Sequence, residues 1–191
     1  MIGFTRKMLG PMLLGLAICA ACFSTSTVQA KEIQKIGAIL PLSGNLSEMG
    51  AAFSGAVQLA IDEINLSYVT NGVDREIELI VHDSGSDFIT ALAKLETLND
   101  EGVQFVIGPA GSEASFICSE YATNNNMLLL SGSSTAVGAS IEGDNLMRFV
   151  YNDKFQGQAV ADLMYNDGIR HIAILAQTDI YGKGLMDAIT S

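Results

Sequence analysis

Short apolar runs alternate with longer stretches whose apolar residues recur every three or four positions from residue 31 to residue 191. Short apolar runs bounded by turn residues are typical of buried strands, and a three- or four-residue spacing is typical of a helix with one buried face. The first pair is a strand over 36–40 and a helix over about 50–67. That helix has one apolar face, formed by Phe53, Ala56, Val57, Ala60, Ile61 and Ile64.

The same alternation continues to the end of the chain. We expect further strands over 77–82, 103–107, 127–130, 146–151 and 171–176, and helices over about 88–98, 112–125, 154–165 and from 181 to the end. Strands that alternate with helices and are apolar on both faces are typical of a parallel sheet covered on both sides. The sequence therefore predicts an α/β fold with a doubly wound parallel sheet.

In open sheets of this kind, ligands bind beyond the carboxyl ends of the strands. The loop Gly108-Pro109-Ala110-Gly111-Ser112-Glu113 follows one strand and opens a helix, with Ser112 at the expected N-cap. Free amides and the helix dipole at such a position favour an anion such as a carboxylate. Taken alone, the loop is better explained as a plain helix cap.

The next strand ends in a second loop of small residues, Ser131-Gly132-Ser133-Ser134-Thr135-Ala136. Its backbone carbonyls and the Thr135 hydroxyl suit an ammonium group, and its small side chains let a ligand approach closely. Considered alone, this loop is better explained as a surface linker. Two such loops at one edge, one suited to an acid and one to an amine, together indicate a zwitterionic ligand.

Charge and motifs exclude several classes of function. Asp and Glu number 21 against 10 for Lys and Arg, which gives a net charge of −11, whereas a nucleic-acid binder needs a basic face. The sequence has no P-loop, no dinucleotide-binding glycine pattern, no zincin motif and no nucleophile elbow. We therefore expect no enzymatic activity, no cofactor, no metal site and no nucleic-acid partner. An exported α/β hydrolase remains the third hypothesis, and it would need the elbow that is missing.

The first thirty residues are typical of a secretory signal peptide. Arg6 and Lys7 precede an apolar run over 8–23, and small residues lead to a cleavage site after Ala30. The run is shorter than the roughly 20 apolar residues of a membrane span, so a permanent anchor is the less favoured alternative. A lipid anchor at Cys22 is another alternative. We expect the protein in the periplasm or on the outer face of the cytoplasmic membrane.

Only one cysteine, Cys118, follows the predicted leader, so the mature chain cannot form an internal disulfide. Its neighbours Phe116, Ile117 and Tyr121 favour a buried structural thiol over a reactive one.

Several further segments are informative in combination. They are 36–44 with Gly50, 60–65, Asp83 and Asp87, 106–109 with Ser112, 131–135, Arg148 with Asp153 and 156–157, and Asp179-x-Tyr181-Gly182-x-Gly184. Together they resemble one family, the type I periplasmic binding proteins of the branched-chain amino acid (Leu/Ile/Val) group. The similarity covers essentially all of residues 31–191.

The resemblance implies two lobes that close on a ligand. Residues 31–151 correspond to the first lobe without its carboxyl-terminal return, and residues 152–191 to the beginning of an incomplete second lobe. By the same resemblance, Ser112 binds the ligand carboxylate beside the Ala110 backbone. The resemblance also implies that the Ser133 carbonyl binds the ligand amine and that Thr135 contacts both ends of the amino-acid backbone. Tyr181 would contact the ligand from the second lobe. Met49 stands where the family often has an aromatic residue in the wall of the site.

What the resemblance implies for function is a solute-binding component of an ABC importer. Its partners would be a small amino acid, or a related amide or acid, and a membrane permease, and we expect a monomer. The alternative is the extracellular sensing domain of a receptor with the same fold. The family's acidic partner of the ligand ammonium lies beyond Ser191, the chain looks cut short, and we expect residues 31–191 alone to bind leucine weakly.

Overall fold

The computed structural model describes residues 31–191, so the predicted signal peptide and the Cys22 anchor lie outside the described residues. The described chain forms five strands, five α-helices and one 3₁₀ helix. In chain order they are β1 (Glu32–Leu40), α1 (Ser47–Thr70), β2 (Arg75–Asp83), α2 (Phe88–Asp100), β3 (Phe105–Ile107), α3 (Ser112–Asn124), β4 (Leu128–Ser131), η1 (Val137–Ala139), β5 (Leu146–Arg148), α4 (Asp153–Asn166) and α5 (Ile180–Thr190).

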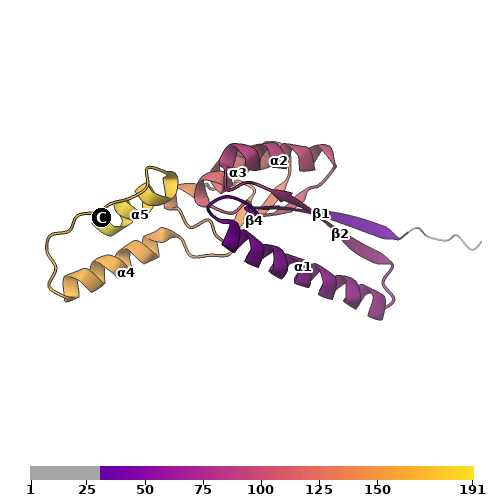
Figure 1. The fold of residues 1–191 in the computed structure, drawn as a ribbon, viewed down its shortest axis with the longest axis horizontal. Helices are drawn as coiled ribbons and strands as arrows, with labels where there is room; N and C mark the ends of the chain where they lie inside the picture. The colour runs from indigo at the N-terminus through magenta and orange to yellow at the C-terminus, as the bar shows by residue number, and fades with distance from the viewer. Residues whose placement is uncertain (1–30) are drawn as a thin grey trace, which may run out of the picture. The chain divides into compact units, whose positions relative to one another are not determined.

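All five strands belong to one parallel sheet with the order β2-β1-β3-β4-β5. In the β1–β2 pair, Glu32 lies opposite Arg75 and Leu40 opposite Asp83, so both strands end at the same edge. Helix α1 covers one side of the sheet, and α2 and α3 cover the other (Figure 1). The predicted α/β class with a doubly wound parallel sheet is confirmed.

The core lies between the sheet and the helices α2 and α3. Its members share full burial and apolar character, and they include Ile39, Leu95, Leu98, Val106, Cys118, Met127 and Leu129. Cys118 is fully buried as expected, and desolvation raises the pKa of its thiol to about 12. A thiol with so high a pKa stays protonated and unreactive at neutral pH.

The strand predicted over 171–176 is wrong: that segment is irregular and exposed, with Ile172 and Leu175 both open to solvent. A strand needs a neighbour for its backbone hydrogen bonds, and these residues pair with none of the five strands of the described sheet. Several boundaries also differ: β1 begins at Glu32 rather than at residue 36, β3 begins at Phe105 rather than at residue 103, and β5 ends at Arg148 rather than at residue 151. The short helix η1 forms where no helix was predicted.

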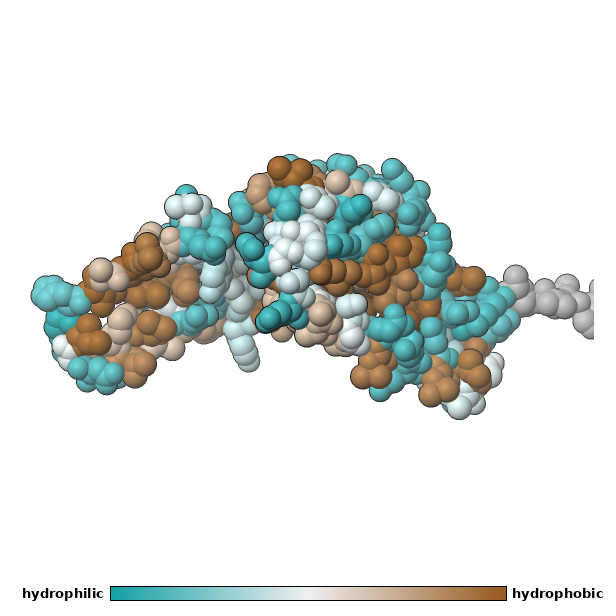
Figure 2. Space-filling view, viewed as in Figure 1, coloured by the Kyte–Doolittle hydropathy of each residue, from teal (hydrophilic) through white to brown (hydrophobic). Residues whose placement is uncertain are grey.

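Helices α4 and α5 pack against each other beyond β5. Gly157 makes this possible, because a Cβ there would lie 2.5 Å from the Ala188 backbone. Figure 2 shows hydrophobic surface over this part of the chain. The large apolar residues exposed here include Phe155 and Leu163 of α4 and Leu175 between α4 and α5. No helix within residues 31–191 is both long and apolar enough to cross a membrane.

Candidate ligand-binding site

Asp83 at the end of β2 holds two loops at the carboxyl edge of the sheet. Its carboxylate accepts hydrogen bonds from the Ser43 amide at 3.1 Å, the Ser43 hydroxyl at 2.7 Å and the Gly85 amide at 2.8 Å. The Ser43 hydroxyl is the largest cause of the lowered pKa of Asp83, and the Gly85 amide adds to it. Asp83 therefore fixes the loops after β1 and β2, a role that requires an ionised carboxylate.

A second set of hydrogen bonds joins the loop after β3 to the loop after β4. The Gly111 amide donates to the Ser133 hydroxyl at 3.2 Å. The Pro109 carbonyl accepts from the Ser115 hydroxyl at 3.0 Å and from the Ser131 hydroxyl at 3.1 Å. The two loops that sequence reasoning selected are therefore in direct contact.

Ser112 takes part in the same contact, but not as the helix cap that the sequence predicted. Gly111, with φ of 91°, is the N-cap of α3, and Ser112 is the first residue of the helix. The Ser112 hydroxyl accepts a hydrogen bond from the Ala136 amide at 3.2 Å, and the residue is 7% exposed. A hydroxyl has one proton and two acceptor lone pairs, so after accepting this bond Ser112 keeps its proton to donate.

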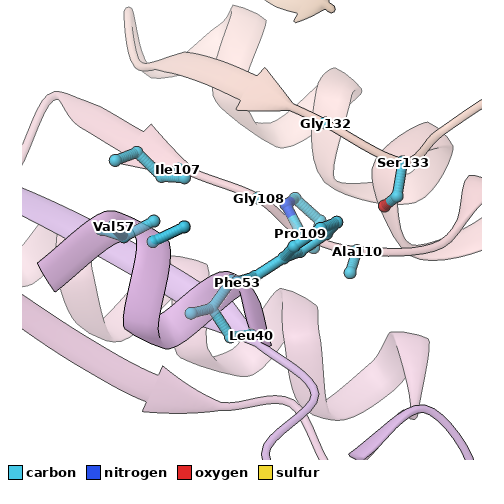
Figure 3. A pocket seen from close by; sticks show the side chains of 10 residues that line it. Leu40, Phe53, Val57, Ile107, Gly108, Pro109, Ala110, Gly132 and Ser133 are labelled. Atoms are coloured by element: carbon cyan, nitrogen blue, oxygen red, sulfur yellow. The ribbon is translucent and has the colours of Figure 1, made fainter. Parts of the chain in front are cut away.

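Ala110 and Ser133 line a pocket of about 180 Å³ between α1 and the sheet. Figure 3 shows the Ser133 hydroxyl at one end, with Phe53, Val57 and Leu40 from α1 and β1 facing Pro109 and Ile107. The remaining lining residues are Ala56, Gly108, Ala110 and Gly132. Apart from the serine, this wall presents hydrocarbon and backbone.

Ser112 and Tyr181 line a second, more polar pocket of about 140 Å³. Its wall also includes Ser84 and Ser86 from the β2–α2 loop and Asp179, whose carboxylate caps α5 by accepting from the Gly182 amide at 2.7 Å. The structure thus brings Tyr181, from the last helix, to the amino end of α3. Tyr181 is 37% exposed.

Thr135 and Met49 do not line either pocket. Thr135 is half-buried next to Ala136, and its carbonyl accepts from the Asp153 amide at 2.8 Å. Met49 is half-buried in the first turn of α1. Of the six predicted site residues, four come from the two joined loops, Tyr181 reaches the amino end of α3, and Met49 stands apart.

Sequence reasoning did not give Ser115 or Asp83 these positioning roles. Both hold loop backbone in place, Ser115 through the Pro109 carbonyl and Asp83 through Ser43. For Ser115 the sequence does hold a usable signal, which is a serine at a buried position of a helix. A buried hydroxyl needs a hydrogen-bond partner, so such a serine indicates a hydrogen-bonding role. Within residues 31–191 no group of three or more His, Cys, Asp or Glu side chains could hold a metal ion.

Comparison with known proteins gives consistent matches. Residues 33–191 match the model of the periplasmic binding protein family. An uncharacterized protein of Methanocaldococcus jannaschii is 28% identical over 92% of this chain and 45% of its own length. The Leu/Ile/Val-binding protein BraC3 of Rhizobium johnstonii is 30% identical over 80% of this chain and 42% of its own length. The chain therefore spans less than half the length of these relatives.

A solved structure and a more distant relative extend the comparison. The branched-chain amino acid transporter substrate-binding protein LivJ of Streptococcus pneumoniae, in complex with isoleucine, superposes with a TM-score of 0.70 at 26% identity, covering 83% of this chain and 46% of that one. Glutamate receptor 2.1 of Arabidopsis thaliana is 25% identical over 77% of this chain and 17% of its own length. The named bacterial relatives are binding proteins rather than enzymes.

Proposed function

We propose, from the premise that this chain belongs to the periplasmic binding protein family, that it is the solute-binding component of an ABC importer. Its ligand would be a branched-chain or similar small amino acid, recognised at the carboxyl edge of the sheet. The names of the relatives BraC3 and LivJ support this ligand class. No catalytic role is proposed for the site.

The observation that carries the proposal is the direct contact between the loops after β3 and β4. The Gly111–Ser133 and Ala136–Ser112 hydrogen bonds join a helix amino end, which favours a carboxylate, to a loop of small hydroxyl residues, which suits an ammonium. Among residues 31–191 no donor hydrogen-bonds to the Ser133 carbonyl, so that oxygen is available to an amine. Apolar surface next to Ala110 and Ser133 favours a ligand with an aliphatic part over a polyol.

Each site residue has a role in this proposal. Ser112 donates its hydroxyl proton to the ligand carboxylate beside Ala110, and the Ser133 carbonyl accepts from the ammonium. Thr135 contacts both ends of the amino-acid backbone, with its hydroxyl at the ammonium, and Tyr181 contacts the ligand from α5. Met49 would contribute an apolar wall from the start of α1. Residues 31–151 would form the first lobe and residues 152–191 the start of the second, with a membrane permease as partner of a monomer.

Residues 1–30 would direct export as a cleaved signal peptide, with lipidation of Cys22 as the alternative. Mass spectrometry of the mature protein separates the two, since cleavage after Ala30 leaves Lys31 as the amino terminus. A receptor sensing domain is the second candidate, favoured by the match to the plant glutamate receptor. The gene sequence decides between them, because a receptor continues into a membrane span and a signalling module.

The amino-acid site is tested by two-dimensional NMR of the chain titrated with L-leucine, a measurement that detects micromolar to millimolar binding. We expect the amides of Gly111, Ser112 and Ser133 to shift. Ser112→Ala should weaken binding by about 1–3 kcal/mol, because a hydrogen bond to a charged group is lost.

Ser119→Ala is the matched control, since Ser119 is a buried serine of the same helix. Its hydroxyl donates to the Phe116 carbonyl at 2.8 Å and not to either loop at the carboxyl edge of the sheet. The affinity of this variant for leucine should equal that of the wild type. Shifts confined to other parts of the chain, or equal affinities of the Ser112→Ala variant and the wild type, would remove the site from this edge of the sheet.

A further inference from the structure

Two residues, Arg148 at the end of β5 and Asp153 at the start of α4, hold the loop after β4 in place. The Arg148 guanidinium donates to the Ser134 carbonyl at 3.2 Å and to the Ala136 carbonyl at 2.8 Å, and it also bonds the Ser140 hydroxyl. The Asp153 amide donates to the carbonyl between them, that of Thr135. Three consecutive carbonyls are thus held, which fixes the backbone on both sides of Thr135.

Capping of α4 does not explain why the Asp153 side chain is buried. It is 1% exposed, and the neighbouring Asn152 already caps α4 by accepting from the Lys154 amide at 3.1 Å. Neither carboxylate oxygen has a hydrogen-bond partner of normal geometry in residues 31–191. A buried carboxylate without such a partner is costly, so a structural explanation has to identify a donor.

The groups that act on this carboxylate are Thr135 and Arg148. Desolvation raises the pKa of Asp153, while the nearby Thr135 hydroxyl and the positive charge of Arg148 act in the opposite direction. Arg148 directs its guanidinium nitrogens to backbone carbonyls and to Ser140, so it supplies charge rather than a hydrogen bond to Asp153. Of these two groups, only the Thr135 hydroxyl is then left as a donor, and the bond from the Asp153 amide to the Thr135 carbonyl holds the two residues next to each other.

We propose that Asp153 is a positioning residue that accepts the hydroxyl proton of Thr135 and so presents Thr135 Oγ1 to the ligand as a hydrogen-bond acceptor. This inference rests on the proposed function, because it gives a direction to one contact of the same site. A hydroxyl whose only proton points inward can accept from an ammonium or amide N–H but cannot donate to a carboxylate. Asp153 thereby selects ligands with an N–H group at this position and disfavours simple carboxylic acids.

The first test needs no ligand. The carboxyl carbon of Asp153 is followed by ¹³C NMR against pH in the full chain, in Thr135→Val and in Thr135→Ser. Valine keeps the shape but removes the hydroxyl, so the pKa of Asp153 should rise in Thr135→Val and return close to the wild-type value in Thr135→Ser. Equal pKa values in the wild type and Thr135→Val would overturn the inference, since Arg148 alone would then account for the charge.

The second test is a double-mutant cycle on L-leucine binding, measured by NMR titration. Asp153→Asn replaces a charged acceptor with a weaker neutral one and should weaken leucine binding about fivefold. In the Thr135→Val background the same change should have no further effect, because Asp153 acts through the missing hydroxyl. Equal weakening in both backgrounds would indicate a purely structural role and overturn the inference.

The two tests separate this inference from the proposed function. If Thr135→Val raises the pKa of Asp153 while the wild type binds no amino acid, the hydrogen bond stands and the amino-acid assignment fails. If the wild type binds leucine but the pKa does not respond, the assignment stands and the role of Asp153 fails. If Asp153→Asn does not fold, the pKa of Asp153 in Thr135→Val and in Thr135→Ser decides the question.

Discussion

A single carboxylate, that of Asp83, holds the loops at the carboxyl edge of the sheet next to β1 and β2. Asp83 receives three hydrogen bonds, and Ser86 extends the set by donating its hydroxyl to the Ser43 carbonyl at 2.7 Å. The hydrogen bonds lower the pKa of Asp83, so the ionised form is preferred more strongly in the folded than in the unfolded chain. Folding stability therefore includes a contribution from Asp83 that depends on pH.

The sign of this contribution leads to a prediction for Ser43→Ala. Because the folded pKa lies below the ordinary value of 3.8, the stabilisation is complete above that value and is lost as the pH falls through the folded pKa. The variant should be less stable than the wild type by about 1 kcal/mol at pH 7, since the pair is partly exposed to solvent. The difference should shrink below about pH 3.8, as measured by urea unfolding at a series of pH values.

Ser54→Ala, on α1, is a serine control for that series because Ser54 makes no hydrogen bond to Asp83. Its small effect should be independent of pH. A difference between Ser43→Ala and the wild type that stayed constant down to pH 2.5 would show that the ionisation of Asp83 is not involved.

At the scale of single residues, the sequence predicts which loops form the candidate site, but not which residues are hydrogen-bonded to one another. Ser112 and Ser133 are recognisable because small and hydroxyl residues follow apolar strands. The pairs Ser43–Asp83 and Ser112–Ala136 are forty and twenty-four residues apart, and both depend on which strands are neighbours in the sheet. Ser112 was misassigned as a cap because Gly111, at a positive φ, takes that position instead.

At the scale of elements, the start of α1 is fixed by close packing on the preceding loop. The helix begins at Ser47, ahead of the predicted start near residue 50, and Leu46 provides no side-chain cap. Gly50 is buried against the Pro41 carbonyl, and a Cβ added there would lie 2.1 Å from that oxygen. The predicted boundary failed because only the tertiary contact shows why glycine occurs inside this helix.

Gly50→Ala should therefore destabilise the protein, although alanine is the better helix former. The clash with the Pro41 backbone should cost about 1–3 kcal/mol, which outweighs the gain of roughly 1 kcal/mol in helix propensity. Gly55→Ala on the same helix is the matched control, because a Cβ there meets nothing within 4 Å. Gly55→Ala should raise the midpoint of urea unfolding and Gly50→Ala should lower it; changes of the same sign would contradict the explanation.

At the scale of the whole molecule, the alternation of strands and helices was sufficient to predict that the candidate loops gather at one edge of the sheet. Parallel strands end at one edge, so the loops after β1 to β4 had to gather there whatever the strand order. The order β2-β1-β3-β4-β5 itself was not predicted, because the apolar pattern within a strand does not indicate which strands will pair with it. The same limit explains the false strand over 171–176, where a strand-like pattern of apolar residues occurs without a partner.

That segment gives the last prediction, which concerns amide hydrogen exchange across residues 31–191. Residues 172–175 pair with no strand of the described sheet and expose Ile172 and Leu175, whereas residues 37–38 of β1 pair with β2 on one side and with β3 on the other. Exchange of an amide requires its hydrogen bond to open, so the β1 amides should be protected by orders of magnitude and those of 172–175 should exchange at nearly the unfolded rate. Protection of 172–175 comparable to that of β1 would show that these residues pair as a strand in solution, and the sequence pattern would then have been right about them.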